Sequence, residues 1–320
     1  MKKNLQISAI IIFLNEEPFI EACIKAIYEH VNRIIIVTNY DTDYWGHHLE
    51  ADRTTDLILN YPDVEKKIHL ILGRKIMDEV LQRNWAIEFD RSLSALGGRK
   101  FEPRAFTLRT IHENYPKTDY YWIIDADEIY DPETVPNVID FVANSKGKNV
   151  LVRGYNHFKK WNYRISLESD HFWQLGFLRS DHLFYGGRGL YSPKFLGRLS
   201  YLHREISENL VNAWKNQIKL PESIGHFYHG SHIGDDRRIQ KKLLISSHAH
   251  AQKKYVDQWM KNVWNVWSPS MKNFHPGPDP SIFSEVVYIP TENLPQSIRE
   301  ATWPEGWIDL LIGSKHSKIS

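Results

Sequence analysis

The chain has 320 residues, of which 25% are charged and 42% hydrophobic, the composition of an ordinary globular protein rather than a disordered or fibrous one. Forty basic residues stand against 39 acidic ones, and a net charge of +1 excludes a global field that would recruit nucleic acid or an anionic membrane. The single cysteine, Cys23, excludes an intramolecular disulfide framework and a cysteine-based zinc site, which fits a reducing compartment.

Apolar runs in the sequence are too short to cross a bilayer, which takes about 18 residues or more. The run from Leu5 to Leu14 follows two lysines, as a signal peptide would, but Gln6 and Ser8 interrupt it and no small-residue cleavage site follows. We therefore expect a first strand here and a cytoplasmic protein.

From residue 4 to about residue 127 the pattern alternates between strands and helices. Strands are expected over the β-rich or continuously apolar runs Ile7–Leu14, Arg33–Val37, Lys67–Leu72 and Tyr120–Ile124. One helix is expected to start at Pro18, with apolar residues at three- and four-residue spacing at Ile20, Cys23, Ile24, Ile27 and Tyr28. A second is expected from about Asp78 to Phe89, followed by a loop over Leu93–Arg104 and another helix ending near Asn114.

Repeated strand–helix–strand units give parallel strands joined by right-handed crossovers. The predicted fold is therefore α/β, with a mostly parallel central sheet flanked by helices.

After Tyr130 the pattern changes. Short strands of mixed polarity are expected at Val150–Arg153 and Tyr155–Tyr163, a flexible loop at Gly186–Gly189, and a basic amphipathic helix over Asp235–Lys254. We place a boundary near Ser192, which divides the chain into residues 1–191 and a helical, aromatic-rich extension of residues 192–320 packed on it. The tryptophans of this extension are expected to pack on the first part, to cover an acceptor cleft or to touch a membrane surface; they are Trp259, Trp264, Trp267, Trp303 and Trp307.

The acidic motif Asp125-Ala126-Asp127-Glu128 directly follows the buried strand at Tyr120–Ile124. Carboxylates at the end of such a strand stand at the edge of the sheet where α/β folds bind their ligands. Asp125 and Asp127 would share one face of an extended chain, and two close carboxylates favour a divalent cation that carries phosphate oxygens. The alternative is a polar strand end that enters a loop.

Other polar segments fall at equivalent positions. Asn15-Glu16-Glu17 follows the first strand, Thr38-Asn39-Tyr40-Asp41 follows the second, and Arg83-Asn84 opens the helix before the acidic motif. Each of them fits a cap or a turn by itself. Their convergence on one edge of the sheet favours a binding site.

The order of these motifs resembles that of family 2 nucleotide-sugar glycosyltransferases with the GT-A fold, most of all the bacterial type related to lipopolysaccharide-core and capsular-sugar transferases. The resemblance covers about residues 5–130, and continues more loosely through His203-Arg204-Glu205 and His226-Phe227-Tyr228-His229, with Lys241-Lys242 behind. It implies transfer of a sugar from a nucleoside-diphosphate sugar to a hydroxyl of a glycan, lipid-linked or small-molecule acceptor, with inversion. A lipid-linked acceptor would bring the protein to the inner face of the membrane.

The resemblance also assigns roles to residues. Contacts to the base, ribose and sugar fall on Leu14, Asn15, Glu17, Thr38, Asn39, Arg83, Asn84 and Asp125. Asp127 would coordinate Mn²⁺ or Mg²⁺, which bridges the diphosphate and neutralises the departing nucleoside diphosphate. A second ligand would be His226 or His229, of which we prefer His229.

The general base that takes the acceptor proton is assigned to Glu205, one residue out of register with the His-Glu pair of related transferases. Its rivals are Glu168, Asp170 and Asp181, and the structural alternative is that Glu205 pairs with Arg204 or with a lysine of a helix.

The chain departs from the family pattern after the second strand. Thr38-Asn39 stands where many members carry an acidic pair and a Ser-x-Asp-x-Thr run, and Asp52-Arg53-Thr54 comes only after an insertion that holds Tyr44–His48. The identity of the nucleotide therefore stays open.

Basic and histidine residues near the C-terminal part have competing interpretations. Arg237, Arg238, Lys241 and Lys242 form either a solvated helix face or a cleft wall that attracts diphosphate. On a helix, His226, His229 and His232 would share a face and could bind zinc, but Gly225, Gly230 and Gly234 favour a loop instead.

Three other functions fit parts of the sequence. A haloacid-dehalogenase phosphohydrolase also has a strand followed by Asp-x-Asp, but its motif lies near the N-terminus. A sugar-nucleotide pyrophosphorylase has a glycine- and arginine-rich loop where this chain has Asn15-Glu16-Glu17. A non-catalytic carbohydrate-binding protein would use the 11 Trp, 16 Tyr and 14 Phe to stack on sugar rings.

Overall fold

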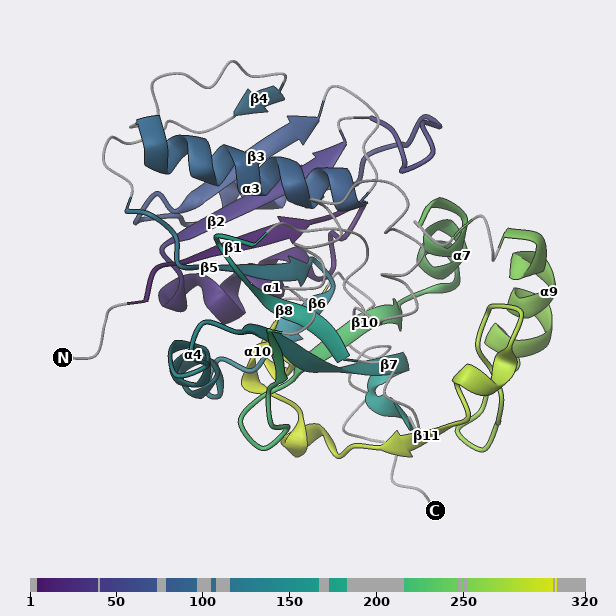
Figure 1. The fold of residues 1–320 in the computed structure, drawn as a ribbon. Helices are drawn as coiled ribbons and strands as arrows, with labels where there is room; N and C mark the ends of the chain where they lie inside the picture. The colour runs from purple at the N-terminus through teal and green to yellow at the C-terminus, as the bar shows by residue number, and fades with distance from the viewer. Residues whose placement is uncertain are drawn as a thin grey trace, which may run out of the picture.

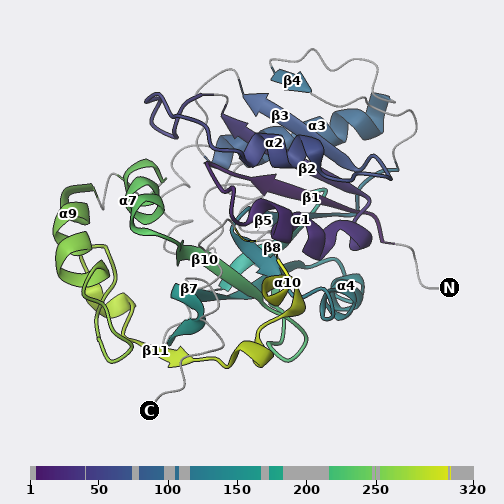
Figure 2. The ribbon, with the colours of Figure 1, turned by 180° about the vertical axis from the view of Figure 1, so that it is seen from behind.

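The computed structural model describes residues 5–39, 41–73, 79–96, 105–107, 116–166, 173–182, 216–246, 249, 253–301 and 303. Within these residues eleven strands form one mixed sheet in the order β4-β3-β2-β1-β5-β8-β7-β10-β6, and β9 and β11 also pair with β7. Figures 1 and 2 show α3 on one face of the sheet and α1 and α2 on the other.

The strands in chain order are β1 Ile7–Ile12, β2 Arg33–Asn39, β3 Ile68–Gly73, β4 Ala105–Thr107, β5 Tyr120–Asp125, β6 Glu128–Tyr130, β7 Asn149–Ser166, β8 Trp173–Arg179, β9 Gln217–Lys219, β10 Phe227–Ile233 and β11 Glu285–Tyr288. The helices are α1 Ile20–Ile27, α2 Thr54–Asn60, α3 Glu79–Leu96, α4 Val135–Ala143, α7 Asp236–Ile245, α9 Val256–Trp259 and α10 Gln296–Arg299. Short 3₁₀ turns lie at Tyr28–His30, Lys253–Tyr255, Pro280–Ile282 and Thr291–Asn293, and a π turn lies at Met260–Trp264.

The centre of the sheet is parallel, as the sequence predicts. β3, β2, β1 and β5 are hydrogen-bonded in that order and run in the same direction. β1, β2 and β3 are buried along their whole length, which explains why they are continuous apolar runs rather than alternating ones. Antiparallel pairs extend the sheet on both sides, from β3 to β4 and from β5 to β8.

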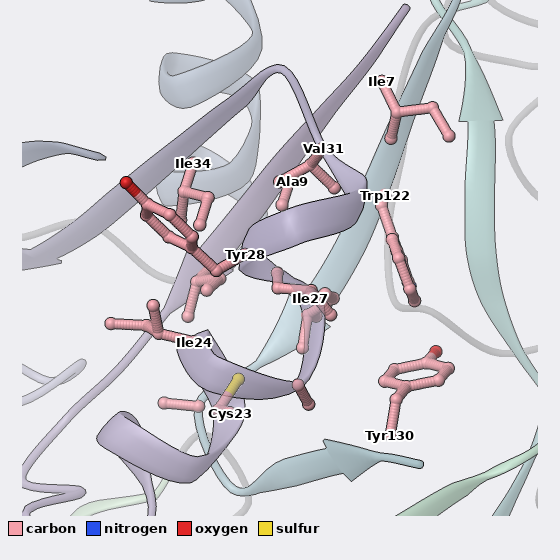
Figure 3. Close-up of a cluster of buried hydrophobic side chains, with 14 of the residues drawn as sticks. Ile7, Ala9, Cys23, Ile24, Ile27, Tyr28, Val31, Ile34, Trp122 and Tyr130 are labelled. Atoms are coloured by element: carbon pink, nitrogen blue, oxygen red, sulfur yellow. The ribbon is translucent and has the colours of Figure 1, made fainter. Parts of the chain in front are cut away.

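The predicted helix after Pro18 is confirmed as α1, whose apolar stripe packs on the sheet. Cys23, Ile24 and Ile27 are buried, and Figure 3 shows them between the helix and side chains of the sheet such as Ala9 and Trp122. The opposite face of the sheet is covered by α3 through residues that include Phe89. The parallel strands are therefore enclosed on both faces, and their ends are left to form a site.

The prediction for residues 93–114 was wrong in two places, and the helix α2 was not predicted. Leu93–Leu96 continue α3 instead of opening a loop. Ala105–Thr107 form β4, antiparallel to β3, where a helix was expected. Phe106 and Thr107 favour a strand, and pairing with the free edge of β3 satisfies backbone groups that a helix would leave exposed there. The rest of that expected helix, to Asn114, lies outside the described residues.

The C-terminal prediction also needs correction. The two short strands expected at Val150–Arg153 and Tyr155–Tyr163 are one strand, β7, which pairs with β8, β9, β10 and β11 along its length. The basic helix expected to reach Lys254 ends at Ile245 as α7, and Lys253 belongs to a separate 3₁₀ turn.

Segments from beyond residue 192 contribute to the same sheet. β10 lies between β7 and β6, and β9 pairs with β7. The boundary itself, at Ser192, and the glycine loop at Gly186–Gly189 lie outside the described residues, so the division into residues 1–191 and 192–320 stays a prediction.

Aromatic side chains pack the C-terminal part against β7. Phe158 of β7 is fully buried and contacts the rings of Trp259, Trp264 and Phe274. Trp303 packs instead against Trp161. The ring of Trp267 contacts those of Phe158 and Tyr163. The expectation that the tryptophans of this region pack on the rest of the chain is confirmed for these four, while Trp307 is outside the described residues. In the part of the chain that the structure describes, no helix has both the length and the apolar character that crossing a membrane would require.

A buried ion pair fastens the amino ends of the parallel strands. The Arg33 Nε of β2 donates to the Asp90 carboxylate of α3 at 2.6 Å, and both side chains are 1% exposed. Ser8 of β1 and Thr118, just before β5, donate to the same carboxylate at 3.0 and 2.7 Å. This network joins three neighbouring strands and α3 at the edge opposite the acidic motif.

Replacing Asp90 by Asn tests this network. The guanidinium of Arg33 would stay buried without its compensating charge, so the free energy of unfolding should fall by about 3–5 kcal/mol. The measurement is urea denaturation. The control is Glu88→Gln, on the same helix, where the side chain is 61% exposed and pairs with Arg91, so the change should stay below about 1 kcal/mol. Equal effects of the two substitutions would contradict the prediction.

Candidate functional site

The loop after β1 forms one wall of the candidate site. Asn15 adopts a left-handed backbone conformation with φ of 57°, which asparagine tolerates better than most residues. Its side-chain amide donates to the Glu50 carbonyl oxygen at 2.9 Å, and its side-chain oxygen accepts from the Asp52 backbone N–H at 3.2 Å. Asn15 therefore shapes the loop and joins it to the segment before α2.

The same segment holds the next two residues of the loop. The Glu17 backbone N–H donates to the Asp52 carboxylate at 3.0 Å, and the Glu16 backbone N–H donates to the Thr54 hydroxyl at 2.9 Å. Asp52 also accepts from the Thr54 backbone N–H at 2.9 Å. Asp52-Arg53-Thr54 thus lies against the loop after β1, despite the insertion that separates it from β2 in the sequence.

A cleft of about 360 Å³ opens between this wall and α7. Its lining residues are Leu14, Asn15, Glu17, Pro18, Glu50, Ala51, Asp52, Asp235, Arg237, Arg238, Lys241, Lys242 and Ile245. Figure 1 shows α7 on the side of the sheet toward which β1, β2 and β5 point. The cleft therefore lies where ligands bind in open α/β folds.

Thr38 and Asn39, at the end of β2, line a smaller hollow next to this cleft. The Thr38 hydroxyl donates to the Phe13 carbonyl oxygen at 2.9 Å, and the Asn39 amide donates to the Asp43 carbonyl oxygen at 3.3 Å. Both residues are 4% exposed. These hydrogen bonds join the end of β2 to the end of β1 and to the insertion that follows β2.

The insertion after β2 forms a tight turn that reaches across to α7. The Asp43 carboxylate accepts from the backbone N–H groups of Trp45 and His47 at 2.8 and 2.9 Å. The Trp45 indole N–H donates to the carbonyl oxygen of Ser246, the C-cap of α7, at 3.1 Å. Burial raises the pKa of Tyr44 well above its usual value, with nearby Asp125 among the groups that add to the effect.

Asp125 ends β5 and pairs with Arg83 of α3. The Arg83 side chain is 1% exposed and also lies 3.5 Å from the Glu79 carboxylate, one turn earlier on the helix. Asn84, the next residue on α3, is half-buried. The structure therefore joins Arg83 and Asp125, which sequence analysis placed in the same site.

Asp127 faces different partners from Asp125. The chain turns at Ala126 and Asp127, so the expectation that the two carboxylates share a face of an extended strand was wrong. The Asp127 Oδ2 atom lies 2.6 Å from the Lys242 Nζ, 3.3 Å from the His229 Nε2 and 2.8 Å from the Ser231 Oγ, which donates to it. Burial alone would raise the pKa of Asp127, but Lys242 and His229 outweigh it and hold the pKa well below its usual range.

His229 is oriented by β7 and β10. The two strands are parallel with His229 opposite Asn156, and the His229 Nδ1 donates to the Asn156 side-chain oxygen at 2.6 Å. Its Nε2 is left to face Asp127 and Ser231. Burial lowers the pKa of His229, but the Asp127 carboxylate more than offsets this and raises it.

His229 and His232 neither share a helix face nor lie in a loop, because they belong to the strand β10. His226 precedes it, and its ring contacts those of Tyr155 and Tyr228, whereas His229 faces Asp127. The ring of His232 contacts Phe283. Side chains alternate between the two faces of a strand, so the His226 and His229 rings lie on opposite sides. Of the two histidines considered as a second metal ligand, His229 is therefore the one beside Asp127.

Glu16 completes the charge cluster and was missed as a site residue. Its side chain is 8% exposed and lies 2.5 Å from the Lys242 Nζ and 2.7 Å from an Arg238 guanidinium nitrogen. Burial raises the pKa of Glu16 even though Lys242 and Arg238 favour its charged form. Lys242 therefore bridges Glu16 and Asp127, and α7 is not simply a solvated face.

Glu16, Ser231 and Asn156 were not selected from the sequence, and the sequence indicates their roles to different degrees. Glu16 stands inside the Asn15-Glu16-Glu17 motif, and Ser231 shares its strand face with His229, so alternation in a predicted strand would have found it. Asn156 gave no signal, because only the pairing of β7 with β10 brings it to His229.

Asp127 and His229 supply two donors that suit a divalent metal ion. A carboxylate oxygen and an imidazole nitrogen 3.3 Å apart can bind one ion, and both are ligands that Mn²⁺ accepts. Among the described residues no group of three or more His, Cys, Asp or Glu side chains is arranged to hold a metal. The site fits an ion that takes its other ligands from water or a bound phosphate.

Of the candidate general bases, only Asp181 is described. It forms an exposed ion pair with Arg179, and Arg179 pairs with Tyr120 at the start of β5. Asp181 therefore lies at the opposite end of β5 from Asp125, which removes it as a rival. Glu205, Glu168 and Asp170 lie outside the described residues.

No protein-family model and no curated protein sequence matches the chain. Similar solved structures include S. aureus TarS 1–349, with 13% identity and a TM-score of 0.38, and the same chain in complex with UDP-GlcNAc, with 10% identity and a TM-score of 0.41. Each match covers 82% of this chain and 74% of the TarS chain. The full TarS structure has 12% identity and a TM-score of 0.39, with 44% of that chain covered.

The buried residue His157 makes the stability of the fold depend on pH. It lies on the face of β7 and β10 opposite His229, where its ring stacks on that of Tyr228. His157 is fully buried there, and its Nδ1 lies 2.6 Å from the Trp161 carbonyl oxygen. Burial lowers its pKa from 6.5 to about 3. Because the unfolded chain takes up this proton near pH 6.5 and the folded chain only near pH 3, stability should fall as the pH drops between these values.

The expected contribution is a slope that approaches about 1.4 kcal/mol per pH unit, and His157→Gln should lose it. The measurement is the free energy of unfolding across the acidic range below neutral pH. His48→Gln, at an exposed position, serves as the control and should keep the slope of the unchanged protein. If the His157→Gln curve runs parallel to that of the unchanged protein, the prediction is wrong.

Proposed function

We propose that the chain is a metal-dependent nucleotide-sugar glycosyltransferase with a GT-A fold, of family 2 and of the bacterial lipopolysaccharide or capsule type. The observation that supports this most is the convergence of the segments after β1, β2 and β5 with α7 at one edge of the parallel sheet. There they combine a cleft of about 360 Å³ with a carboxylate–imidazole pair. This is the combination that binding a nucleoside diphosphate with a divalent ion requires.

In this proposal the nucleotide occupies the cleft beside the loop after β1. Leu14, Asn15 and Glu17 line it from one side, and the basic residues of α7 line it from the other. Thr38 and Asn39 shape the adjoining hollow for part of the base or ribose. The Arg83–Asp125 pair, with Asn84 beside it, would present hydrogen-bonding groups to ribose or sugar hydroxyls.

Asp127 and His229 would hold Mn²⁺ or Mg²⁺, while His226 is not retained because its ring lies against Tyr155 and Tyr228. When bound, such an ion neutralises the negative charge that develops on the departing nucleoside diphosphate. Asn156 would fix the orientation of the His229 ring through its Nδ1, as partners of metal-binding histidines commonly do.

On the acceptor side, Glu205 would remove the proton of the attacking hydroxyl, and the displacement would invert the anomeric carbon. The acceptor would be a glycan, a lipid-linked sugar or a small molecule. A cytoplasmic location, at the inner face of the membrane where the acceptor is lipid-linked, belongs to this proposal.

Asp127→Asn tests the donor site. A panel of nucleoside-diphosphate sugars is first assayed with Mn²⁺ for stabilisation of the protein and for slow hydrolysis of the donor. With the donor that the panel identifies, the substitution should lower metal-dependent turnover by about 100-fold or more, because it removes a charged ligand. Asp140→Asn, at an exposed position on α4, is the control and should retain full turnover.

Three outcomes would contradict the proposal. If no nucleotide sugar stabilises the protein with or without metal, the donor site does not exist. If the Asp127→Asn variant binds glycans as the unchanged protein does and neither turns over a donor, the chain is a carbohydrate-binding protein. Release of phosphate from phosphate monoesters would instead favour the phosphohydrolase alternative.

Glu205→Gln tests the acceptor side separately. Loss of the general base should lower the rate of transfer by about 10²–10⁴-fold, and the affinity for the nucleotide sugar should not change. The measurements are acceptor-dependent turnover and donor binding by calorimetry. Glu208→Gln, the same substitution at the next glutamate of the sequence, is the control and should transfer normally. A Glu205→Gln variant that transfers at the normal rate would exclude Glu205 as the base.

A further inference from the structure

The Asp127 Oδ2 atom has no room for another cation while Lys242 is in place. It already accepts from the Ser231 hydroxyl and the Lys242 ammonium, and it is also the oxygen that faces the His229 Nε2. A carboxylate oxygen offers about two lone-pair directions. A metal ion bound by the His229 Nε2 and by this Asp127 oxygen, which faces it, must therefore displace one of these partners.

Lys242 is the partner that has to leave. Like charges a few ångströms apart repel strongly where water is largely excluded, and the Asp127 side chain is only 5% exposed. Ser231 is neutral and can turn its hydroxyl to the other lone pair or to the metal. The ammonium cannot become an acceptor, because it has three donors and no lone pair.

We propose that Lys242 is a built-in cation that holds Asp127 when no metal is bound and is displaced from it, but not from Glu16, when a divalent ion binds. The inference rests on the proposed function, because it assigns the metal to Asp127 and His229. It makes Lys242 a competitor that lowers the affinity of the free protein for metal.

Glu16 would remain an ion-pair partner for the Lys242 ammonium after it leaves Asp127. Lys242 Nζ lies 2.5 Å from one Glu16 oxygen, and Arg238 binds the other at 2.7 Å. The Lys242 side chain is 22% exposed and lines the cleft, so a short movement away from Asp127 keeps it in the cleft wall. There it would face the diphosphate of a bound donor, and metal and donor would bind cooperatively.

The same arrangement accounts for the burial of Asp127. An uncompensated buried carboxylate is strongly destabilising, and breaking a buried pair by removing one partner costs about 3–5 kcal/mol. Lys242 and His229 face Asp127, while Lys242 and Arg238 face Glu16.

The test is Mn²⁺ binding to the free protein without any nucleotide, measured by the electron paramagnetic resonance signal of unbound Mn²⁺. Lys242→Met and Lys242→Gln should each bind Mn²⁺ at least about 10-fold more tightly than the unchanged protein, because the competing charge is gone. Their melting temperatures should also rise more on addition of Mn²⁺. Lys261→Met is the control, because Lys261 is exposed and lies outside the cleft, and its affinity for Mn²⁺ should not change.

Affinity that is equal or weaker in both Lys242 variants, while Asp127→Asn abolishes Mn²⁺ binding, would overturn the inference and leave the proposed function standing. Stabilisation by no nucleotide sugar and binding of no Mn²⁺ to any variant would instead overturn the proposed function itself.

A crystal structure of the unchanged protein soaked with Mn²⁺ provides a test that does not depend on the folding of the variants. The expected result is an ion on Asp127 and His229, with the Lys242 ammonium moved away from Asp127 and still paired with Glu16. An ion bound at Asp127 with Lys242 still within hydrogen-bonding distance of that carboxylate would overturn the inference. An ion bound elsewhere would overturn it as well.

Discussion

The bridge that Lys242 forms between Glu16 and Asp127 connects three segments of the candidate site. Glu16 comes from the loop after β1, Asp127 from the turn between β5 and β6, and Lys242 from α7. Two buried carboxylates this close to each other need cations from outside the parallel strands. Arg238 and Lys242 of α7 supply them, while Ile239 and Leu243 of the same helix pack in an apolar cluster. The wall of the cleft is thus set by electrostatics as much as by apolar packing.

Strand pairing places the other half of the site. β10 is antiparallel to β6 with His229 opposite Glu128, and it is parallel to β7 with His229 opposite Asn156. These two registers bring His229 beside Asp127, the residue before β6, and bring Asn156 to its other ring nitrogen. A shift of one residue in β10 would turn His229 to the opposite face, where His157 and Tyr228 lie. The proximity of Asp127 and His229 is therefore a property of the sheet rather than of a flexible loop.

The sequence predicted what depends on local pattern. Strands buried on both faces are continuous apolar runs, and α1 has a clear three- and four-residue spacing, so both were found. What failed depends on pairing between distant segments. Ala105–Thr107 form a strand because the edge of β3 is available to them, and the histidines around β10 separate because a strand alternates its faces. Glu16 was adjacent to predicted site residues, but its role requires Lys242 of α7, which is 226 residues away in the chain.

The two acidic residues of the Asp-x-Asp motif differ in what can replace their cation. Asp125 pairs with Arg83, which is 1% exposed, anchored on α3 and paired as well with Glu79. Drawing Asp125 to a metal would leave a buried guanidinium with weaker compensation, which is costly. Asp127 pairs with a lysine on a flexible stem that has a second carboxylate to hold it. The same motif thus contains one permanent ion pair and one exchangeable one, and this difference assigns the proposed metal to Asp127 and leaves Asp125 to the hydroxyl groups of the donor.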